Sequence, residues 1–178
     1  PPTEPVAEIS AGGVHTCAIF ASGSVRCWGF NFRGQLGYGD TADVMESDVS
    51  TLSAISFGTT YAATAVASGQ AHNCVVFANG HAKCWGKNVN GQLGTGNTVD
   101  VGDDSGEVAQ LPFLSFPTTH TITNLALGLD HSCAAFAPGT MRCWGRNDYG
   151  QLGIGSTTDL SNAAAAPFIF SGTTSVSH

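Results

Sequence analysis

Cysteine and histidine are the residues of this chain whose spacing could do chemistry. Each of three segments carries a His-x-Cys sequence, and a second cysteine follows ten residues after the first. Thiolates and imidazoles bind zinc, but two cysteines ten residues apart do not match the short spacings of common zinc sites. The alternative chemistry is a disulfide bond. The residues concerned are His15, Cys17, Cys27, His72, Cys74, Cys84, His131, Cys133 and Cys143.

Nothing around these histidines has the arrangement of a catalytic site. A general base needs an oriented nucleophile and an acid beside it, and no Ser, Asp or Glu accompanies the histidine in all three copies. The histidines, and the tryptophan after each second cysteine, are therefore interpreted as residues that pack the repeat units. We expect no enzyme activity, no cofactor and no metal. The packing residues are His15, His72, His131, Trp28, Trp85 and Trp144.

The elements that must position these residues come from an internal repeat. Three similar blocks begin at Gly12, Gly69 and Gly128, and each is followed by an acidic connector and an apolar run. Each unit contains four strand-like runs, none with the length or the 3.6-residue period of a helix. A three-residue loop that ends in glycine, as in 21–23, separates the first two runs of each block. This pattern predicts β-hairpins.

The block GGVHTCAIFASGSVRCWGFNFRGQLGYG and its two copies resemble the repeat of the regulator of chromosome condensation family. The resemblance covers almost the whole chain and implies a β-propeller, usually of seven blades. It does not imply one function, because members of the family include a nuclear exchange factor for a small GTPase, a plant ultraviolet photoreceptor and a secreted bacterial inhibitor of β-lactamase.

We therefore predict an all-β fold, a β-propeller-like array of about three four-stranded antiparallel blades, either open or part of a larger propeller. Residues 1–178 form a single repeat domain, with units of about 6–63, 64–122 and 123–178. The first strand of each unit is expected to complete the preceding blade. Residues 6–11 then resemble the fourth strand of a blade whose other strands are absent. Either this strand completes the last blade of another chain, or the sequence is part of a longer propeller.

The hairpin register bears directly on the cysteines. Residues whose numbers sum to 44 face each other across the first hairpin, so Cys17 faces Cys27. Their Cβ atoms are then about 4.5–5.5 Å apart, and a modest adjustment brings them to the roughly 3.5–4.5 Å of a disulfide. The repeat favours three local disulfides. Because disulfides persist in oxidising compartments, we expect a secreted or cell-surface protein.

Charge excludes some classes of partner and suggests another. The net charge is -7 with only 6 Lys and Arg, so binding to nucleic acid is not expected. No apolar run approaches the length of a membrane-spanning helix, so membrane insertion is not expected either. The acidic connectors vary between copies, as partner-binding loops of repeat proteins do, although a solvated acidic rim is the simpler interpretation. The candidate partner loops contain Asp40, Asp43, Asp48, Asp100, Asp103 and Asp104.

Together these observations predict a non-enzymatic extracellular structural module. Its partners are neighbouring chains of the same protein, which assemble by blade stacking and end-strand complementation into a filament, sheath or surface array. A head-to-tail contact of this kind generates a ring or an open filament. The alternative is a soluble propeller domain that binds a protein ligand through its loop face.

Overall fold

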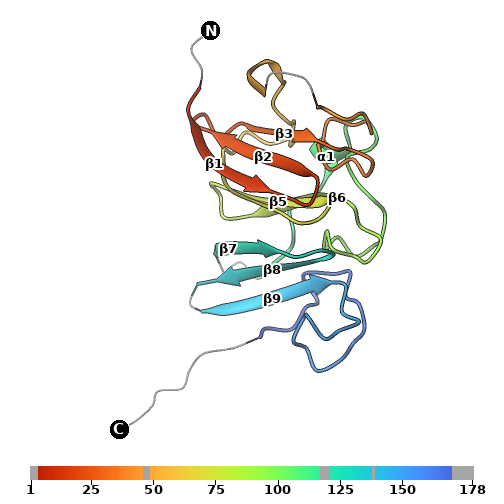
Figure 1. Cartoon of the computed structure of the whole chain (residues 1–178). Coiled ribbons are helices and arrows are strands. Elements are labelled where there is room, and N and C mark those ends of the chain that lie inside the picture. The colour runs from red at the N-terminus through yellow and green to blue at the C-terminus, as the bar shows by residue number, and fades with distance from the viewer. Residues whose placement is uncertain (1–3, 46–48, 117–120, 138, 170–178) are drawn as a thin grey trace.

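Each of the three repeats folds into one antiparallel sheet. The structure is a computed structural model, and it describes residues 4–45, 49–116, 121–137 and 139–169. The strand orders are β1-β2-β3, β4-β5-β6 and β7-β8-β9, and Figure 1 shows the sheets one above another. The strands are β1 (Val6–Ala11), β2 (His15–Phe20), β3 (Val25–Gly29), β4 (Ala63–Ser68), β5 (His72–Phe77), β6 (Ala82–Gly86), β7 (Ile122–Leu127), β8 (His131–Phe136) and β9 (Thr140–Gly145).

The connecting segments follow the third strand of each sheet. They contain two short helical turns, η1 (Val49–Thr51) and α1 (Glu107–Gln110). We call each sheet together with its connecting segment a blade. The described residues within 4–57 form blade 1, those within 63–116 form blade 2, and those within 121–169 form blade 3.

The second and third strands of each blade form the predicted hairpin, and its turn depends on glycine. Gly23 has a φ of 79°, and its N–H donates a hydrogen bond to the carbonyl of Phe20 at 2.8 Å. A Cβ atom here would lie 2.4 Å from Cβ of Ala62, so both the left-handed backbone and the close approach require glycine. The turn sets the register in which Cys17 lies directly opposite Cys27.

One disulfide bond crosses each hairpin. The Cα atoms of each pair are 4.1 Å apart, and no cysteine is free. The three local pairings predicted from the sequence are therefore present. They are Cys17–Cys27, Cys74–Cys84 and Cys133–Cys143.

The prediction of four regular strands per blade was wrong in detail, because the described sheets have three. The apolar run after each connector lies along the third strand but forms few backbone hydrogen bonds with it. Ile55 N–H donates to the carbonyl of Val25 at 2.9 Å, and Leu114 N–H donates to that of Ala82 at 2.8 Å. Ile55 and Leu114 are buried, so burial of side chains holds this segment rather than repeated backbone pairing.

The assignment of the first strand to the preceding blade was also wrong. β1 pairs antiparallel with β2, as β4 does with β5 and β7 with β8. The reason is the short turn between them, in which Gly12 N–H donates to the carbonyl of His15 at 2.8 Å. Tight turns join antiparallel neighbours, so the strand before each turn belongs to the blade that follows it.

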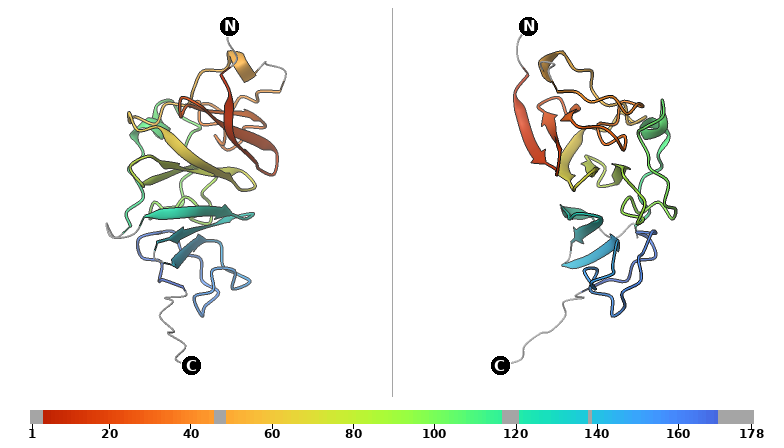
Figure 2. Two further views of the ribbon diagram at one scale, coloured as in Figure 1. Left: turned by 90° about the vertical axis from the view of Figure 1, so that its left-hand side faces the viewer. Right: turned by 45° about the vertical axis from the view of Figure 1, so that its right-hand side comes forward.

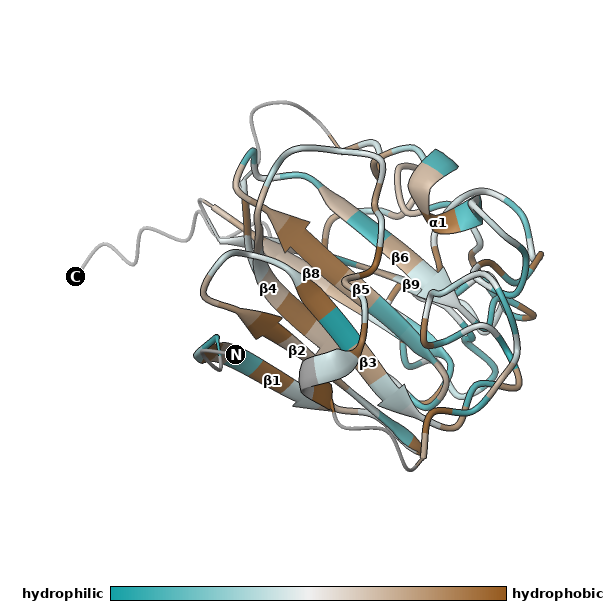
Figure 3. Cartoon of the chain, turned by 90° about the horizontal axis from the view of Figure 1, so that it is seen from above, coloured by the Kyte–Doolittle hydropathy of each residue, from teal (hydrophilic) through white to brown (hydrophobic). Residues whose placement is uncertain are grey.

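The hydrophobic core lies between the blades. One cluster joins blade 1 to blade 2 and a second joins blade 2 to blade 3, and the views in Figure 2 show the sheets following one another as blades do. Figure 3 shows hydrophobic colours concentrated on the strands, whereas the loops near α1 are mixed with hydrophilic residues. Each blade is therefore buried against its neighbour.

The disulfide in the middle blade gives the first testable prediction. Replacing Cys74 and Cys84 with alanine is expected to lower the free energy of unfolding by about 3 kcal/mol, because the unfolded chain gains the entropy of an opened short loop. Urea denaturation measures this loss. The matched variant lacks Cys133 and Cys143, which close a loop of the same length, and it should lose a similar amount. Unchanged stability in both variants would contradict the prediction.

Candidate functional site

The contact between neighbouring blades, which we call the joint, is the most elaborate arrangement of side chains in the described chain. Each blade contributes a rear face toward the blade that follows and a front face toward the blade that precedes it. The rear face of blade 1 consists of Cys17, Ile19, Val25, Cys27 and Leu36. The front face of blade 2 consists of Ala63, Val66, Val75, Phe77 and Trp85.

The second joint repeats this composition. The rear face of blade 2 consists of Cys74, Val76, Ala82, Cys84 and Leu93, and the front face of blade 3 consists of Ile122, Leu125, Ala134, Phe136 and Trp144. Each disulfide of the first two blades therefore lies in a joint. There it packs against the β-strands of the next blade.

In each joint a tryptophan of one blade donates a hydrogen bond to a backbone carbonyl of the preceding blade. The indole N–H of Trp85 donates to the carbonyl of Gln35 at 3.0 Å, and that of Trp144 donates to the carbonyl of Gln92 at 3.0 Å. Both indoles are fully buried. A Cβ atom on Gly37 would lie 2.8 Å from Nε1 of Trp85, so the glycine after Gln-Leu makes room for the ring.

The histidines form a second link across each joint. His15 Nε2 lies 2.7 Å from Oδ1 of Asn73, and because an amide oxygen only accepts, the imidazole carries its proton on Nε2. The amide of Asn73 then donates to the carbonyl of Gln35 at 2.8 Å. Thus the carbonyl of Gln35 accepts hydrogen bonds from Asn73 and from Trp85.

The next joint uses a hydroxyl where the first uses an amide. Ser132 Oγ donates to the carbonyl of Gln92 at 2.8 Å and accepts from Nε2 of His72 at 3.0 Å. Burial lowers the pKa of His72 from 6.5 to about 3, and burial also lowers the pKa of His15. Both imidazoles are therefore neutral at physiological pH, which suits packing between blades better than acid–base catalysis.

An asparagine holds the Gly-Gln-Leu-Gly turn that presents each glutamine carbonyl. Asn88 is fully buried, its Oδ1 accepts from Leu93 N–H at 2.9 Å, and its Nδ2 donates to the carbonyl of Val99 at 2.9 Å. Asn31 and Asn147 accept from Leu36 and Leu152 in the same way. The turns are therefore held by hydrogen bonds within each blade and do not depend on the joint.

Several aspartates of the acidic connectors make hydrogen bonds or ion pairs with other residues of the chain, which the sequence did not indicate. Asp43 accepts from Asn31 N–H at 2.7 Å, and Asp40 accepts from the Asn31 amide at 3.1 Å. Asp100 accepts from Asn88 N–H at 2.7 Å and pairs with Arg33 of the preceding blade at 3.0 Å.

The remaining candidate loop residues differ in position. Asp103 and Asp104 lie in the loop before α1, where the Asp103 backbone packs against Gly34 of blade 1. Asp48 lies outside the described residues. Of the named acidic residues, Asp103 and Asp104 are therefore the ones whose carboxylates no recorded contact occupies within the described part of the chain.

Sequence reasoning missed two acidic residues that the structure uses. Asp159 accepts from Asn147 N–H at 2.8 Å, and the signal was present, because each such aspartate follows its asparagine by 12 residues. Asp130 is 2.7 Å from Nζ of Lys87 and 3.7 Å from Arg146. No sequence signal marks Asp130, since the equivalent residue of blade 2 is Ala71.

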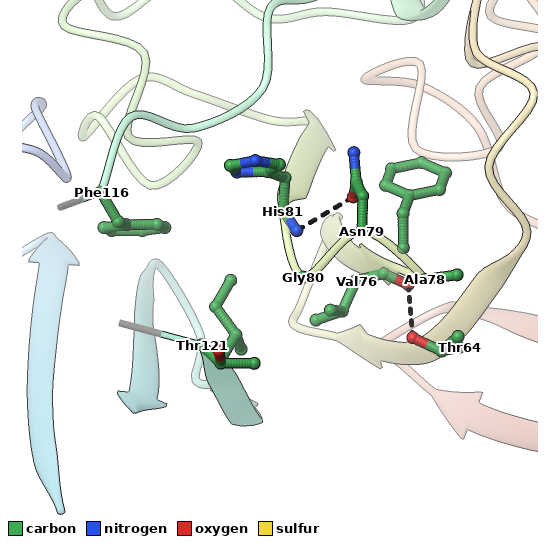
Figure 4. A pocket seen from close by; sticks show the side chains of 10 residues that line it. Thr64, Val76, Ala78, Asn79, Gly80, His81, Phe116 and Thr121 are labelled. Atoms are coloured by element: carbon green, nitrogen blue, oxygen red, sulfur yellow. Dashed lines mark hydrogen bonds between the residues drawn. The ribbon is translucent and has the colours of Figure 1, made fainter. Parts of the chain in front are cut away.

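A cavity of about 510 Å³ lies between the hairpin of blade 2 and the start of β7, and Figure 4 shows His81 and Asn79 on one side of it and Phe116 and Thr121 on the other. Within the described ranges, no group of three or more His, Cys, Asp or Glu side chains could hold a metal ion. No helix among these residues is long and apolar enough to cross a membrane.

The pH dependence of stability tests the burial of His72. Its folded pKa is below its ordinary value of 6.5, so its contribution is complete above that pH and is lost as the pH falls toward 3. Between pH 7 and pH 5 the free energy of unfolding should fall by about 2 kcal/mol from this residue. The control is His72→Gln, which keeps a neutral donor. Urea denaturation at the two pH values should show a smaller loss for the variant; equal losses would contradict the prediction.

Known proteins share this repeat. Models of the regulator of chromosome condensation (RCC1) repeat match residues 6–35, 63–92 and 122–151, and a second model of the same repeat matches 79–135. The ultraviolet-B receptor UVR8 of Arabidopsis thaliana is 28% identical over 88% of this chain and 33% of its own length. The probable E3 ubiquitin-protein ligase HERC4 of Homo sapiens is 31% identical over 88% of this chain and 14% of its own length. The chain thus spans a third or less of these relatives.

Solved structures show the same fold. Human WBSCR16 superposes with a TM-score of 0.72 at 23% identity, over 95% of this chain and 40% of that one. Prp20p of Saccharomyces cerevisiae superposes with a TM-score of 0.68 at 19% identity, over 93% of this chain and 38% of that one. With three matched repeats and joints of one design, the chain belongs to the regulator of chromosome condensation (RCC1) repeat family, and its three sheets are blades of a β-propeller.

Proposed function

We propose that this chain is a non-catalytic, extracellular structural module that acts by stacking its blades against further blades. One observation carries the proposal. Ile9 on the front face of blade 1 is 64% exposed, whereas the equivalent Val66 and Leu125 are 6% and 9% exposed because a preceding blade covers them. Apolar surface of this kind marks an interaction site. Stacking at this face would bury Ile9 as Val66 and Leu125 are buried.

Stacking replaces the exchange of end strands in this proposal. β1 is already hydrogen-bonded to β2 of its own chain, so it does not serve as the missing strand of another molecule. The contact that supports assembly is instead the joint, in which side chains from two complete sheets meet. The described side chains that make specific contacts are concentrated in these joints and in the turns that support them.

The disulfides support an extracellular location. All six cysteines are paired, and such bonds are rare in reducing compartments. The four cysteines of the first two blades are almost inaccessible to solvent. Reduction would place free thiols inside the joints and remove the links that fix each hairpin.

Alkylation of the cysteines, in protein taken separately from the medium, the cell surface and the cell interior, tests the extracellular location. The chain should be recovered from the culture medium or the cell surface, and it should gain no mass from a thiol reagent until it has been reduced, after which it gains six labels. Mass spectrometry reads both states. A chain recovered inside cells with six labels before reduction would contradict the proposal.

A second candidate function is capture of a protein ligand by the loop end of the blades. Phe30 and Phe32 are 42% and 48% exposed, their ring centroids are 5.2 Å apart, and Arg33 lies beside the Phe32 ring. Exposed aromatic and arginine side chains are common anchors in interfaces. The yeast relative Prp20p is described with its binding to Gsp1p and histones.

A measurement of self-association tests whether contact between copies uses the stacked faces or the loop end of the blades. The double variant Phe30→Ser, Phe32→Ser removes the aromatic pair from the loop end but leaves the front face of blade 1 and the rear face of blade 3 intact. If the chain assembles by stacking, sedimentation velocity should give the same self-association constant for this variant and the parent. A marked loss of self-association would favour the loop end as the contact surface.

A further inference from the structure

The front face of blade 1 matches the front faces that are buried elsewhere in the chain. Trp28 is half-buried, whereas Trp85 and Trp144 are fully buried. Val6 is 56% exposed, whereas the equivalent Ala63 and Ile122 are 6% and 8% exposed. Ala18 and Phe20 are buried on this face, and the Arg26 guanidinium lies over the Phe20 ring at 4.3 Å.

The polar groups of this face also match. Thr16 occupies the position of Asn73 and Ser132, the two residues that bridge a histidine to a glutamine carbonyl. Its hydroxyl can accept one hydrogen bond and donate another, as that of Ser132 does. Within the described chain, neither the Thr16 hydroxyl nor the Trp28 indole N–H has a recorded hydrogen-bond partner.

The rear face of blade 3 carries the other half of a joint. Gln151 is only half-buried, whereas Gln35 and Gln92 are fully buried. Its carbonyl is presented by the same turn, since Leu152 N–H donates to Asn147 Oδ1 at 2.9 Å. Among the described residues no side chain donates to this carbonyl, and the His131 imidazole has no recorded hydrogen bond.

We propose that a second copy of this chain docks head to tail, with the rear face of its blade 3 on the front face of blade 1. The inference rests on the stacking proposed above and names its partner. In this joint the Trp28 indole N–H and the Thr16 hydroxyl donate to the carbonyl of Gln151 of the second copy. His131 Nε2 of that copy donates to Thr16. Every donor then meets an acceptor, as in the two joints within the chain.

A polar contact at the rim has the same complementarity. Arg33 and Asn90 occupy one position of blades 1 and 2, and they contact the carboxylates of Asp100 and Asp159 of the following blade at 3.0 Å and 3.1 Å. The third residue at that position is Tyr149, which is 85% exposed. In the head-to-tail joint its hydroxyl faces Asp43 of the next copy, whose second carboxylate oxygen is open to a donor. The contact is heterologous, so it generates a ring or an open filament.

Two blocking variants test the direction of the contact. Ile9→Arg places a charge on the front face of blade 1, and Ala135→Arg places one on the rear face of blade 3, where Ala135 is equivalent to the buried Ile19 and Val76. In sedimentation velocity under oxidising conditions, the parent chain should assemble and each variant alone should be monomeric. An equimolar mixture should form a one-to-one dimer and nothing larger, because only one front face and one rear face remain compatible.

The outcomes distinguish this inference from the proposed function. If the parent assembles and neither variant weakens that assembly, the head-to-tail joint is overturned but stacking is not. Dimers of Ala135→Arg alone would have the same meaning, because they require front-to-front contact. A parent chain that is monomeric at every concentration would overturn both. Circular dichroism and thermal unfolding confirm that each variant is folded. The pair Val6→Glu and Tyr149→Glu, at two other exposed positions, repeats the test if either arginine variant fails to fold.

The hydrogen bond of Trp28 provides a readout that general packing does not. Trp28→Phe keeps an aromatic ring but removes the N–H, so it should weaken self-association by about fivefold. The double variant Trp28→Phe, Ala135→Arg mixed with Ile9→Arg should show the same loss at a single joint. An unchanged association constant for Trp28→Phe would overturn the assignment of the Gln151 carbonyl as its acceptor.

Discussion

The backbone carbonyl of the glutamine in each Gly-Gln-Leu-Gly turn is the group on which the stacking of the blades depends. It accepts one hydrogen bond from a buried indole and another from the residue that bridges to a histidine. A buried carbonyl without partners is costly, and here both lone pairs are used by the next blade. The asparagine inside the turn aims the carbonyl outward, and glycine leaves room for the indole. A short loop thereby becomes the docking point for a whole sheet.

The local parts of the fold could be predicted from the sequence. Alternating apolar residues and a glycine turn set the hairpin, and the hairpin placed Cys17 opposite Cys27. The fourth run of each unit was harder, because apolar residues such as Ile55 show that a segment is buried but not whether its backbone joins a ladder. The strand at 6–11 was predicted to belong to the wrong blade for a similar reason. Its sequence pattern identifies a strand but does not identify the strand with which it pairs.

Charge was the least informative signal. An aspartate in a variable connector suggested a surface for partners. In Asp43 and Asp100, however, one carboxylate oxygen accepts a hydrogen bond from a backbone N–H of the same blade. The direction of that N–H is a property of the folded turn and cannot be inferred from composition. The constant 12-residue interval was the one clue to a structural role. Lys87 and Asp130 meet across a joint only because two sheets are stacked, so no local pattern reveals them.

The repetition of one joint has a consequence for how the array holds together. In the described part of the chain, the main contacts between strands of different sheets join adjacent sheets. The free energy of the array therefore approximates a sum of terms for single blades and terms for adjacent pairs. Blade 2 shares two joints within the described chain, whereas blades 1 and 3 share one each. Cooperativity therefore passes from neighbour to neighbour along a line rather than through a common centre. A gene that gains or loses one repeat changes the length of that line without requiring a new interface.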